Sequence, residues 1–439
     1  MIDAIASPWL PYLILVAVTA LARLLCGSWF APAAFVGLVW SFFIGVCLIL
    51  TQYPVPGRGM WMLVLLVVAI QLGALVVHQL RPRDSGSSLV TSVHEFEALV
   101  VPCRRYGLIC TAIALVGCVY FLFTSLVEFD LPFTGLSVLE VGARWTLLRY
   151  DDVYEPWSVR LLIMWLHPAA LLGGILFACS LTRLNRLVAA ITLLPAFAYG
   201  FLTGARAAIL LGLTCWVSGY VALLCIRSRG RLHLFSAKRI SSLLLSAAVM
   251  VVVFLAIDGV RDSKWYQGFV IDVREQKLAT YIFGSPAAFA GWYAHADAAP
   301  PLWGARTFAG EFDLLGIKSR TIGTYTATSN VTSGADATNV FTIFRGLIED
   351  FTPYGALLIA AIIGAFASWA FGALTITASG ALLGLSAFYG AMLISPLWSL
   401  FTFNGATLAW IVAWCVISRA NRESQVFSLS SHGRQVPCQ

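Results

Sequence analysis

Three arginines lie at the ends of apolar stretches of the chain, and two more lie in an outward loop; groups of this type and position could bind a phosphorylated substrate. Arg206 lies in a four-residue turn between two apolar runs, Arg261 follows another run, and Arg345 precedes a long uncharged stretch. Arg144 and Arg149 are weaker candidates from an earlier loop. A guanidinium binds phosphate oxygens in pairs and keeps its charge. Each arginine alone fits an interfacial residue reaching to lipid phosphates, but together they predict a diphosphate site.

Carboxylates close to Arg345 could supply acid–base chemistry. Glu349 follows Arg345 by four residues, so the two side chains share one face of a helix. Glu349 could therefore activate an acceptor hydroxyl or hold Arg345 in place, and we favour the second role. Asp350 and His295 are further candidates for a general base. The sequence does not rank them against three other acids, namely Asp272, Glu311 and Asp313.

Aromatic residues near these groups could contact sugar rings. Trp265, Tyr266 and Trp292 are the candidates in the segment that carries Arg261 and Arg345. Aromatic residues are also enriched at membrane–water interfaces, where they anchor helices. Both interpretations stay open for each of the three.

The composition of the chain is typical of a membrane protein. Of 439 residues, 59% are apolar or aromatic and 11% are charged, and the mean hydropathy is +0.85. A soluble domain has about 25% charged residues, so this chain lacks the polar surface to cover a globule. Disordered, nucleic-acid-binding and disulfide-scaffold classes are excluded by the same composition. The ten cysteines show no metal-ligand spacing and are expected as buried thiols.

Long runs without charge predict an all-α polytopic membrane protein. A helix needs about 20 residues to cross the hydrocarbon core. We expect eleven spans, with a range of ten to thirteen; they lie at 9–22, 32–52, 60–80, 106–127, 161–180, 187–203, 207–226 and 241–257, with three more in 351–418 broken near Thr375–Gly380 and Pro396–Asn404. The runs are continuously apolar, which excludes the alternating strands of a barrel.

The basic residues predict how the chain is oriented. With alternating loops, one side holds 15 Lys and Arg, against five in the short loops of the other side. The positive-inside rule makes the richer side cytoplasmic. We therefore expect a single membrane domain over 1–439, with the N-terminus outside and a cytoplasmic tail at 419–439.

Two outward segments have room for chemistry. The first is 129–157, and the second is the long loop 259–350. Such a long loop is expected to contain elements of its own. Within it, 278–296 predicts a short re-entrant or interfacial helix. The Gly/Thr/Ser-rich stretch 321–339 predicts a mobile loop.

Four of these segments resemble one family. TGARAAIL, AIDGVRD, YIFGSPAAFAGWY and above all TNVFTIFRGLIEDFTPYGALL are similar to segments of the O-antigen polymerase (Wzy) family of oligosaccharide repeat-unit polymerases. The resemblance covers roughly Leu181 to Ile394. It implies a GT-C-type glycosyltransferase of the bacterial inner membrane with a periplasmic active site. Its implied donor and acceptor are undecaprenyl-diphosphate-linked oligosaccharides, and a chain-length regulator is a possible partner besides the lipid bilayer.

The chemistry of such a reaction agrees with the residues. A lipid-linked sugar diphosphate already carries its leaving group, and the sequence holds no P-loop, no GxGxxG at a helix start and no DxD. Catalysis needs cations for the departing diphosphate and a base for the acceptor hydroxyl. We therefore expect arginines to take this role with no metal and no cofactor, and we expect no nucleic-acid partner.

Two other functions remain open. An O-antigen ligase that transfers finished glycan to a lipid A core would use the same donor and the same arginines. A polysaccharide or lipid transporter would form no bond. The span interiors contain no Asp, Glu, Lys or Arg, which disfavours ion-coupled transport, although sodium sites can be made from backbone carbonyls.

Overall fold

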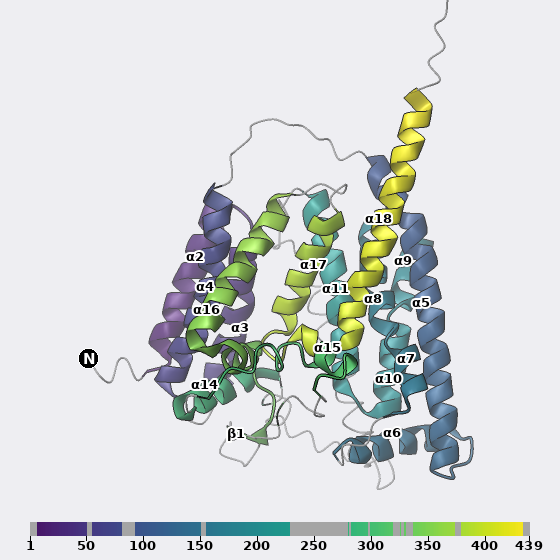
Figure 1. Cartoon of the computed structure of the whole chain (residues 1–439), viewed down its shortest axis with the longest axis horizontal. Helices are drawn as coiled ribbons and strands as arrows, with labels where there is room; N and C mark the ends of the chain where they lie inside the picture. Colours follow the sequence, from purple (N-terminus) through teal and green to yellow (C-terminus); the bar gives the residue numbers. More distant parts are fainter. Residues whose placement is uncertain are drawn as a thin grey trace, which may run out of the picture.

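Apolar helices running along one common direction make up most of the protein (Figure 1). The computed structural model describes residues 7–50, 55–80, 93–150, 155–228, 280, 282–296, 299–318, 325, 329–330, 337–373 and 379–432. The long or bundle-forming helices are α2 (Trp9–Cys26), α3 (Pro32–Leu50), α4 (Gly57–Leu80), α5 (Val93–Glu128), α8 (Leu166–Cys179), α9 (Arg183–Ile191), α10 (Leu194–Thr203), α11 (Arg206–Arg227), α16 (Ile343–Gly372), α17 (Ser379–Ile394) and α18 (Asn404–His432).

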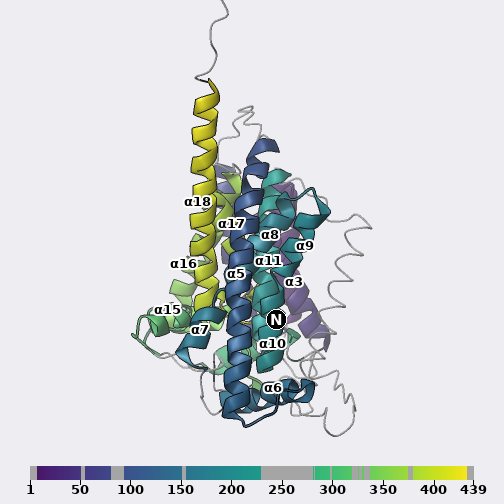
Figure 2. The same ribbon diagram turned by 90° about the vertical axis from the view of Figure 1, so that its right-hand side faces the viewer.

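Shorter elements gather at one end of this bundle. They are α6 (Gly135–Tyr150), α7 (Trp157–Ile163), α14 (Ser285–His295), α15 (Ala309–Leu314), the three-residue 3-10 helix η2 (Leu400–Thr402), and the strands β1 (Ser329–Asn330) and β2 (Ala337–Thr338). The two strands pair antiparallel, with Ser329 opposite Thr338. Helices α6 and α15 lie toward the lower end in both Figure 1 and Figure 2. We call this end the site end.

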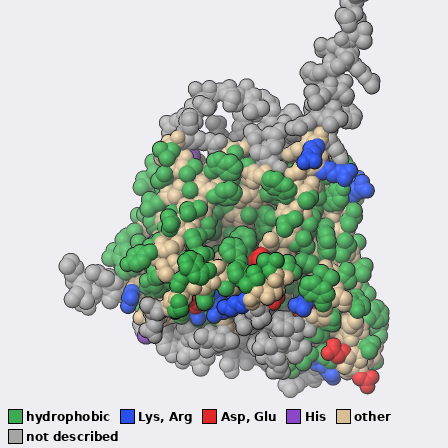
Figure 3. All heavy atoms as spheres, in the orientation of Figure 1, with side chains coloured by type: hydrophobic (Ala, Val, Ile, Leu, Met, Phe, Trp, Pro, Cys, Tyr) green, Lys and Arg blue, Asp and Glu red, His purple; other side chains and the backbone are tan. Residues whose placement is uncertain are grey.

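Within the part of the chain that the structure describes, eight helical segments are long and apolar enough to cross a membrane, so the predicted polytopic membrane fold is confirmed. Two of these segments contain a break: Trp157–Cys179 comprises α7 and α8, and Arg183–Thr203 comprises α9 and α10. Hydrophobic side chains cover most of the face in Figure 3, while charged side chains gather along its lower rim and at its upper end. This distribution fits an apolar belt between two polar surfaces.

The number of spans and the GT-C type stay predictions. The predicted span 241–257 lies outside the described residues. Helix α17 has 16 residues, fewer than the roughly 20 that a straight crossing needs. The last predicted span falls within α18, which continues through the charged segment after Ile417. The break predicted at Pro396–Asn404 is present, because η2 and irregular backbone separate α17 from α18.

Close approach of α4 and α16 joins the N-terminal helices to the C-terminal ones. A Cβ on Gly73 would overlap the carbonyl oxygen of Ala361, and a Cβ on Gly364 would overlap that of Ile70. The two backbones can therefore meet only because both positions lack a side chain, which is the usual device where helices pack in a membrane. On another side of α4, a buried side-chain amide joins this helix to α3: Gln71 donates to the Ala33 carbonyl at 3.1 Å.

Among the described residues, two groups of buried side chains form most of the core. The larger group joins α3, α4, α8, α11, α16, α17 and α18 through side chains such as Trp40, Tyr389 and Phe344. The smaller lies where α5, α6, α7 and α10 meet, around Phe121 and Trp145. Segment 129–157, treated as a loop from its sequence, is thus largely the helix α6 packed on the bundle.

Candidate functional site

The start of α16 places the predicted arginine and its carboxylates inside a helix at the site end. The helix begins at Ile343, eight residues before the uncharged stretch from which its span was predicted. At Thr352 the backbone leaves the helical region, with φ 63° and ψ 166°, and Pro353 follows. A residue before proline disfavours the helical conformation, so the helix is broken there. The short first part carries Arg345, Glu349 and Asp350.

Arg345 and Glu349 form an ion pair along this first part, and Arg306 joins them from a distant loop. The Nε of Arg345 donates to Oε1 of Glu349 at 2.8 Å. The other carboxylate oxygen, Oε2, lies 3.1 Å from Nε of Arg306. The exposed side-chain fractions are 9% for Arg345, 18% for Glu349 and 35% for Arg306. We call these three residues the arginine–glutamate cluster; in it one carboxylate balances one of two positive charges.

Aromatic rings enclose the guanidinium of Arg345. Its Cζ lies 3.7 Å from the ring centroid of Tyr325, 4.2 Å from that of Phe341 and 5.0 Å from that of Trp292. Cation–π attraction is strongest where water is excluded, and here the arginine is buried. The rings and the carboxylate therefore fix the guanidinium in one orientation. Trp292, predicted to contact sugar, packs against Arg345.

Tyr325 departs from its prediction. It falls in the stretch 321–339 expected to be mobile, yet its side chain is buried at 4% exposure. Burial, reinforced by the nearby carboxylate of Glu349, raises the pKa of Tyr325 far above its ordinary value. The phenol is therefore neutral at physiological pH and cannot serve as a general base.

Asp350, a predicted general base, is instead a backbone anchor. Its side chain is fully buried, and its two oxygens accept from the backbone N–H of Arg306 at 3.0 Å and of Thr307 at 2.7 Å. The backbone N–H groups of Leu302 and Trp303 donate to the carbonyls of Glu349 and Asp350. Both carboxylate oxygens are occupied and shielded from solvent, which leaves none facing an acceptor. Asp350 thereby holds the turn that presents Arg306.

Arg206 opens α11, and its side chain is buried at 5% exposure. The preceding turn depends on Gly204, whose φ of 61° ends α10 in the left-handed region that favours glycine. The turn is packed on α6, since the hydroxyl of Thr146 donates to the Thr203 carbonyl at 3.4 Å. Helices α11 and α16 both begin at the site end, so Arg206 and Arg345 lie at the same end of the bundle (Figure 1).

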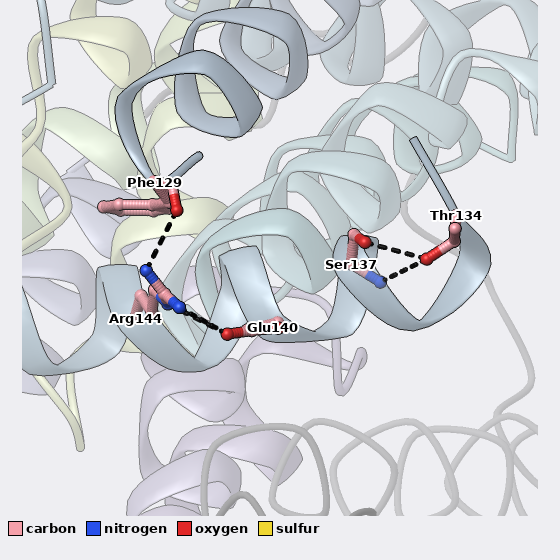
Figure 4. A network of polar contacts seen from close by, with 5 residues as sticks. All are labelled: Phe129, Thr134, Ser137, Glu140 and Arg144. Carbon is pink, nitrogen blue, oxygen red and sulfur yellow. Dashed lines mark hydrogen bonds and ion pairs between the residues drawn. The ribbon is translucent and has the colours of Figure 1, made fainter. Parts of the chain in front are cut away.

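Arg144 holds α6 in place (Figure 4). Its Nε donates to Oε1 of Glu140 at 3.1 Å, and its Nη1 donates to the Phe129 carbonyl at 3.3 Å. Its guanidinium also lies 5.3 Å from the Phe129 ring centroid. The hydroxyl of Thr134 caps the start of the helix by accepting from the Ser137 N–H at 3.2 Å. These contacts give Arg144 a structural role in joining α6 to the end of α5.

The remaining predicted residues add little to the site. Arg261, Trp265 and Tyr266 lie outside the described residues, and of Arg149 only the backbone, at the end of α6, is described. His295 is exposed at the end of α14 and bonds the Gly291 carbonyl of its own helix through Nδ1 at 2.9 Å. Among the described residues, no group of three or more His, Cys, Asp or Glu is placed to hold a metal ion.

Arg306, Tyr325 and Phe341 were not predicted as site residues. The sequence did contain a signal for Arg306: it is an arginine between two glycine- and aromatic-rich stretches, PLWGARTFAG, in the outward loop. Its partnership with Glu349, 43 residues away, exists only in the fold. Together the described groups can bind an anion: two guanidiniums with a shared carboxylate, held by aromatic walls at the end of the apolar bundle.

Comparisons of the chain with models of known protein families, with curated proteins and with solved structures found no match.

Proposed function

We propose that the protein is a membrane glycosyltransferase that polymerises undecaprenyl-diphosphate-linked oligosaccharide repeat units of an O-antigen or a similar surface polysaccharide. The proposal places it in the bacterial inner membrane with the site end facing the periplasm. The N-terminus is then periplasmic and the C-terminus cytoplasmic, as the distribution of basic residues predicts. A chain-length regulator is a possible further partner.

One observation carries the proposal. The guanidinium of Arg345 is buried and held through Nε by Glu349, while its Nη1 has no hydrogen-bond partner among the described residues. A buried donor without a partner costs about 1–3 kcal/mol, so a ligand that supplies an acceptor is favoured there. Phosphate oxygens are the acceptors that guanidinium groups bind best at such a site.

The position of the cluster supports a lipid-borne substrate. The apolar belt of the bundle ends at the rim where the charged side chains lie (Figure 3). A polyprenyl chain would remain in the bilayer while its diphosphate reached the arginines at this rim. Arg345, with Arg306 and Arg206, would stabilise the negative charge that develops on the leaving diphosphate.

Glu349 suits the orienting role better than that of a base. Both of its oxygens lie beside guanidinium nitrogens, so both are already engaged by the two arginines. In the proposal Glu349 holds Arg345 and Arg306 at the spacing that a diphosphate needs. The base for the acceptor hydroxyl is then a group other than Asp350, and exposed His295 remains a candidate.

The direct test is reconstitution. The purified protein in lipid vesicles would receive isolated undecaprenyl-diphosphate-linked repeat units, and gel electrophoresis would resolve the products. We expect long glycans from the wild type, and single repeats from Arg345→Ala and Arg206→Ala. Arg422→Ala is the matched control, because this arginine is exposed on α18 and lies away from the site end. Thermal unfolding of each variant separates lost activity from lost folding.

The outcomes distinguish the three functions. Absence of long chains from the wild type would rule out the polymerase proposal, and long chains from both arginine variants at wild-type rates would rule out the arginines as its diphosphate site. A ligase would give no lengthening but would attach preformed long glycan to lipid A core when both are supplied. A transporter would give no new bond with either acceptor.

A further inference from the structure

A recess lies at the site end, apart from the arginine–glutamate cluster. It is a cavity of about 200 Å³ between α7, α15 and the start of α18. It is lined by Trp157, Arg160, Leu161, Met164, Asp313, Leu314 and Asn404. Pockets for drug-sized ligands begin at roughly 300 Å³, so this one suits a single small ring. We call it the α7–α15 pocket.

The lining combines an aromatic ring with planar polar groups. Trp157 is 54% exposed, and the guanidinium of Arg160 lies 5.3 Å from its ring centroid. The Oδ1 atom of Asn404 is buried and has no hydrogen-bond partner among the described residues. Asp313 adds a carboxylate to the lining. An indole covers apolar C–H groups, while amide, carboxylate and guanidinium groups bind neighbouring hydroxyls.

One side of the pocket is formed by α15 and the start of α18, which are held together by close contacts. Gly310 packs so closely on the start of α18 that a Cβ there would overlap Oδ1 of Asn404. Glu311 accepts a hydrogen bond from the hydroxyl of Thr407, which ties α15 to α18. Ser399 donates to the Thr307 carbonyl at 3.0 Å and anchors the residues before α15. The pocket is therefore formed by packed helices.

We infer that the α7–α15 pocket binds a pyranose ring of the acceptor glycan. A pyranose presents an apolar C–H face and a rim of hydroxyls, which is the combination that this lining matches. The inference rests on the proposed function for the identity of the acceptor, whereas sugar binding itself is measurable without catalysis.

The short distance between the pocket and the arginine–glutamate cluster fits an acceptor site, the pocket, beside a donor site, the cluster. Arg306 and Asp313 are seven residues apart, and most of the intervening chain is the helix α15. With a rise of about 1.5 Å per helical residue, the two sites are on the order of 10 Å apart. The same segment joins them, because Asp350 holds the Arg306 backbone and α15 continues from it.

Ligand-observed saturation-transfer NMR tests this inference on the full-length protein in phospholipid nanodiscs, because glycoside detergents would compete. The probes are methyl glycosides of glucose, galactose, mannose, rhamnose and N-acetylglucosamine, and the free oligosaccharide released from the host's lipid-linked repeat unit. We expect transfer to at least one probe. Trp157→Ala and Asn404→Ala should weaken binding about ten-fold, as removal of a packed ring or a buried hydrogen-bond group does.

Trp369→Ala is the matched control, since Trp369 is equally exposed but lies on α16 away from the pocket. Its signal should equal that of the wild type. Absence of transfer to every probe, or equal transfer in Trp157→Ala, Asn404→Ala and wild type, would overturn the inference. Arg345→Ala should keep the sugar signal. Failure of the proposed function would appear instead as absence of chain growth by the wild type in the reconstitution, with the sugar signal intact.

Discussion

Glu349 Oε1 accepts from Arg345 Nε at 2.8 Å, one helical turn away on α16. The same carboxylate meets Arg306 through its second oxygen, so the carboxylate lies between two guanidinium groups. Each arginine would repel the other without it, at a site that is largely shielded from water. The functional interpretation of the cluster therefore depends on Glu349 as much as on the arginines.

Removing the charge of Glu349 should weaken both folding and substrate binding. We expect Glu349→Gln to destabilise the protein by about 2–3 kcal/mol, below the 3–5 kcal/mol of a fully buried pair because the cluster is partly exposed. In the polymerisation assay an orienting role predicts a raised KM and an unchanged pH profile. Loss of kcat together with the acidic limb of the profile would instead identify Glu349 as the base.

Arg345→Lys tests what the guanidinium itself supplies. Lysine keeps the positive charge but lacks the planar group that can hold Glu349 and a phosphate at once. We expect activity to fall at least about ten-fold, which corresponds to roughly 1.4 kcal/mol of lost binding. Thermal unfolding measured in parallel should show a smaller loss than in Arg345→Ala. Full activity in the lysine variant would argue against bidentate phosphate binding.

Asp350 should be important for stability. Asp350→Ala leaves the backbone N–H groups of Arg306 and Thr307 without acceptors, and each unsatisfied buried group costs about 1–3 kcal/mol. Asp350→Asn keeps one acceptor oxygen and should cost less. Glu128→Gln, at the exposed end of α5, is the matched control. Denaturation curves showing no difference between Asp350→Ala and the control would contradict the anchoring role.

The raised pKa of Tyr325 predicts how the stability of the protein changes at alkaline pH. Because its pKa is raised in the folded protein, its stabilising contribution is complete below the ordinary tyrosine pKa of about 10 and is lost as pH rises above it. We expect the stability difference between wild type and Tyr325→Phe to be constant from pH 7 to 9 and then to shift against the wild type. A difference that stays flat through pH 11 would show that the phenol is not buried.

Side chains at the two glycines where α4 and α16 cross should destabilise the protein. Gly364→Val and Gly73→Val each place a branched side chain against a backbone carbonyl, and overpacking of this kind costs about 1–3 kcal/mol. Gly135→Ala is the control, because open space surrounds that position at the start of α6. Equal melting temperatures for all three variants would place α4 and α16 farther apart than the structure does.

Much of the helical framework could be predicted because each helix is determined by its own stretch of sequence. A run of about 20 uncharged residues has only one way to satisfy its backbone in a bilayer, so seven of the eight runs predicted before residue 351 recur as helices, and the eighth lies outside the described residues. The spacing of Arg345 and Glu349 was likewise sufficient to predict their contact. The helix α6 was missed because its 16 residues include charges and form no long uncharged run, and its packing partners α5 and α10 cannot be recognised from the sequence.

The sequence by itself determined that this chain is a polytopic membrane protein and predicted its candidate site residues at the ends of the apolar runs, since hydrocarbon excludes charge regardless of how the helices pack. Only the tertiary structure decided that Arg306 joins Arg345 across 39 residues, that Asp350 faces backbone N–H groups, and that Tyr325 is buried against a guanidinium. These relationships depend on long-range packing, in which the loop before α15 folds back on α16. No local pattern encodes that contact, because its energy comes from groups that meet only after the helices have assembled.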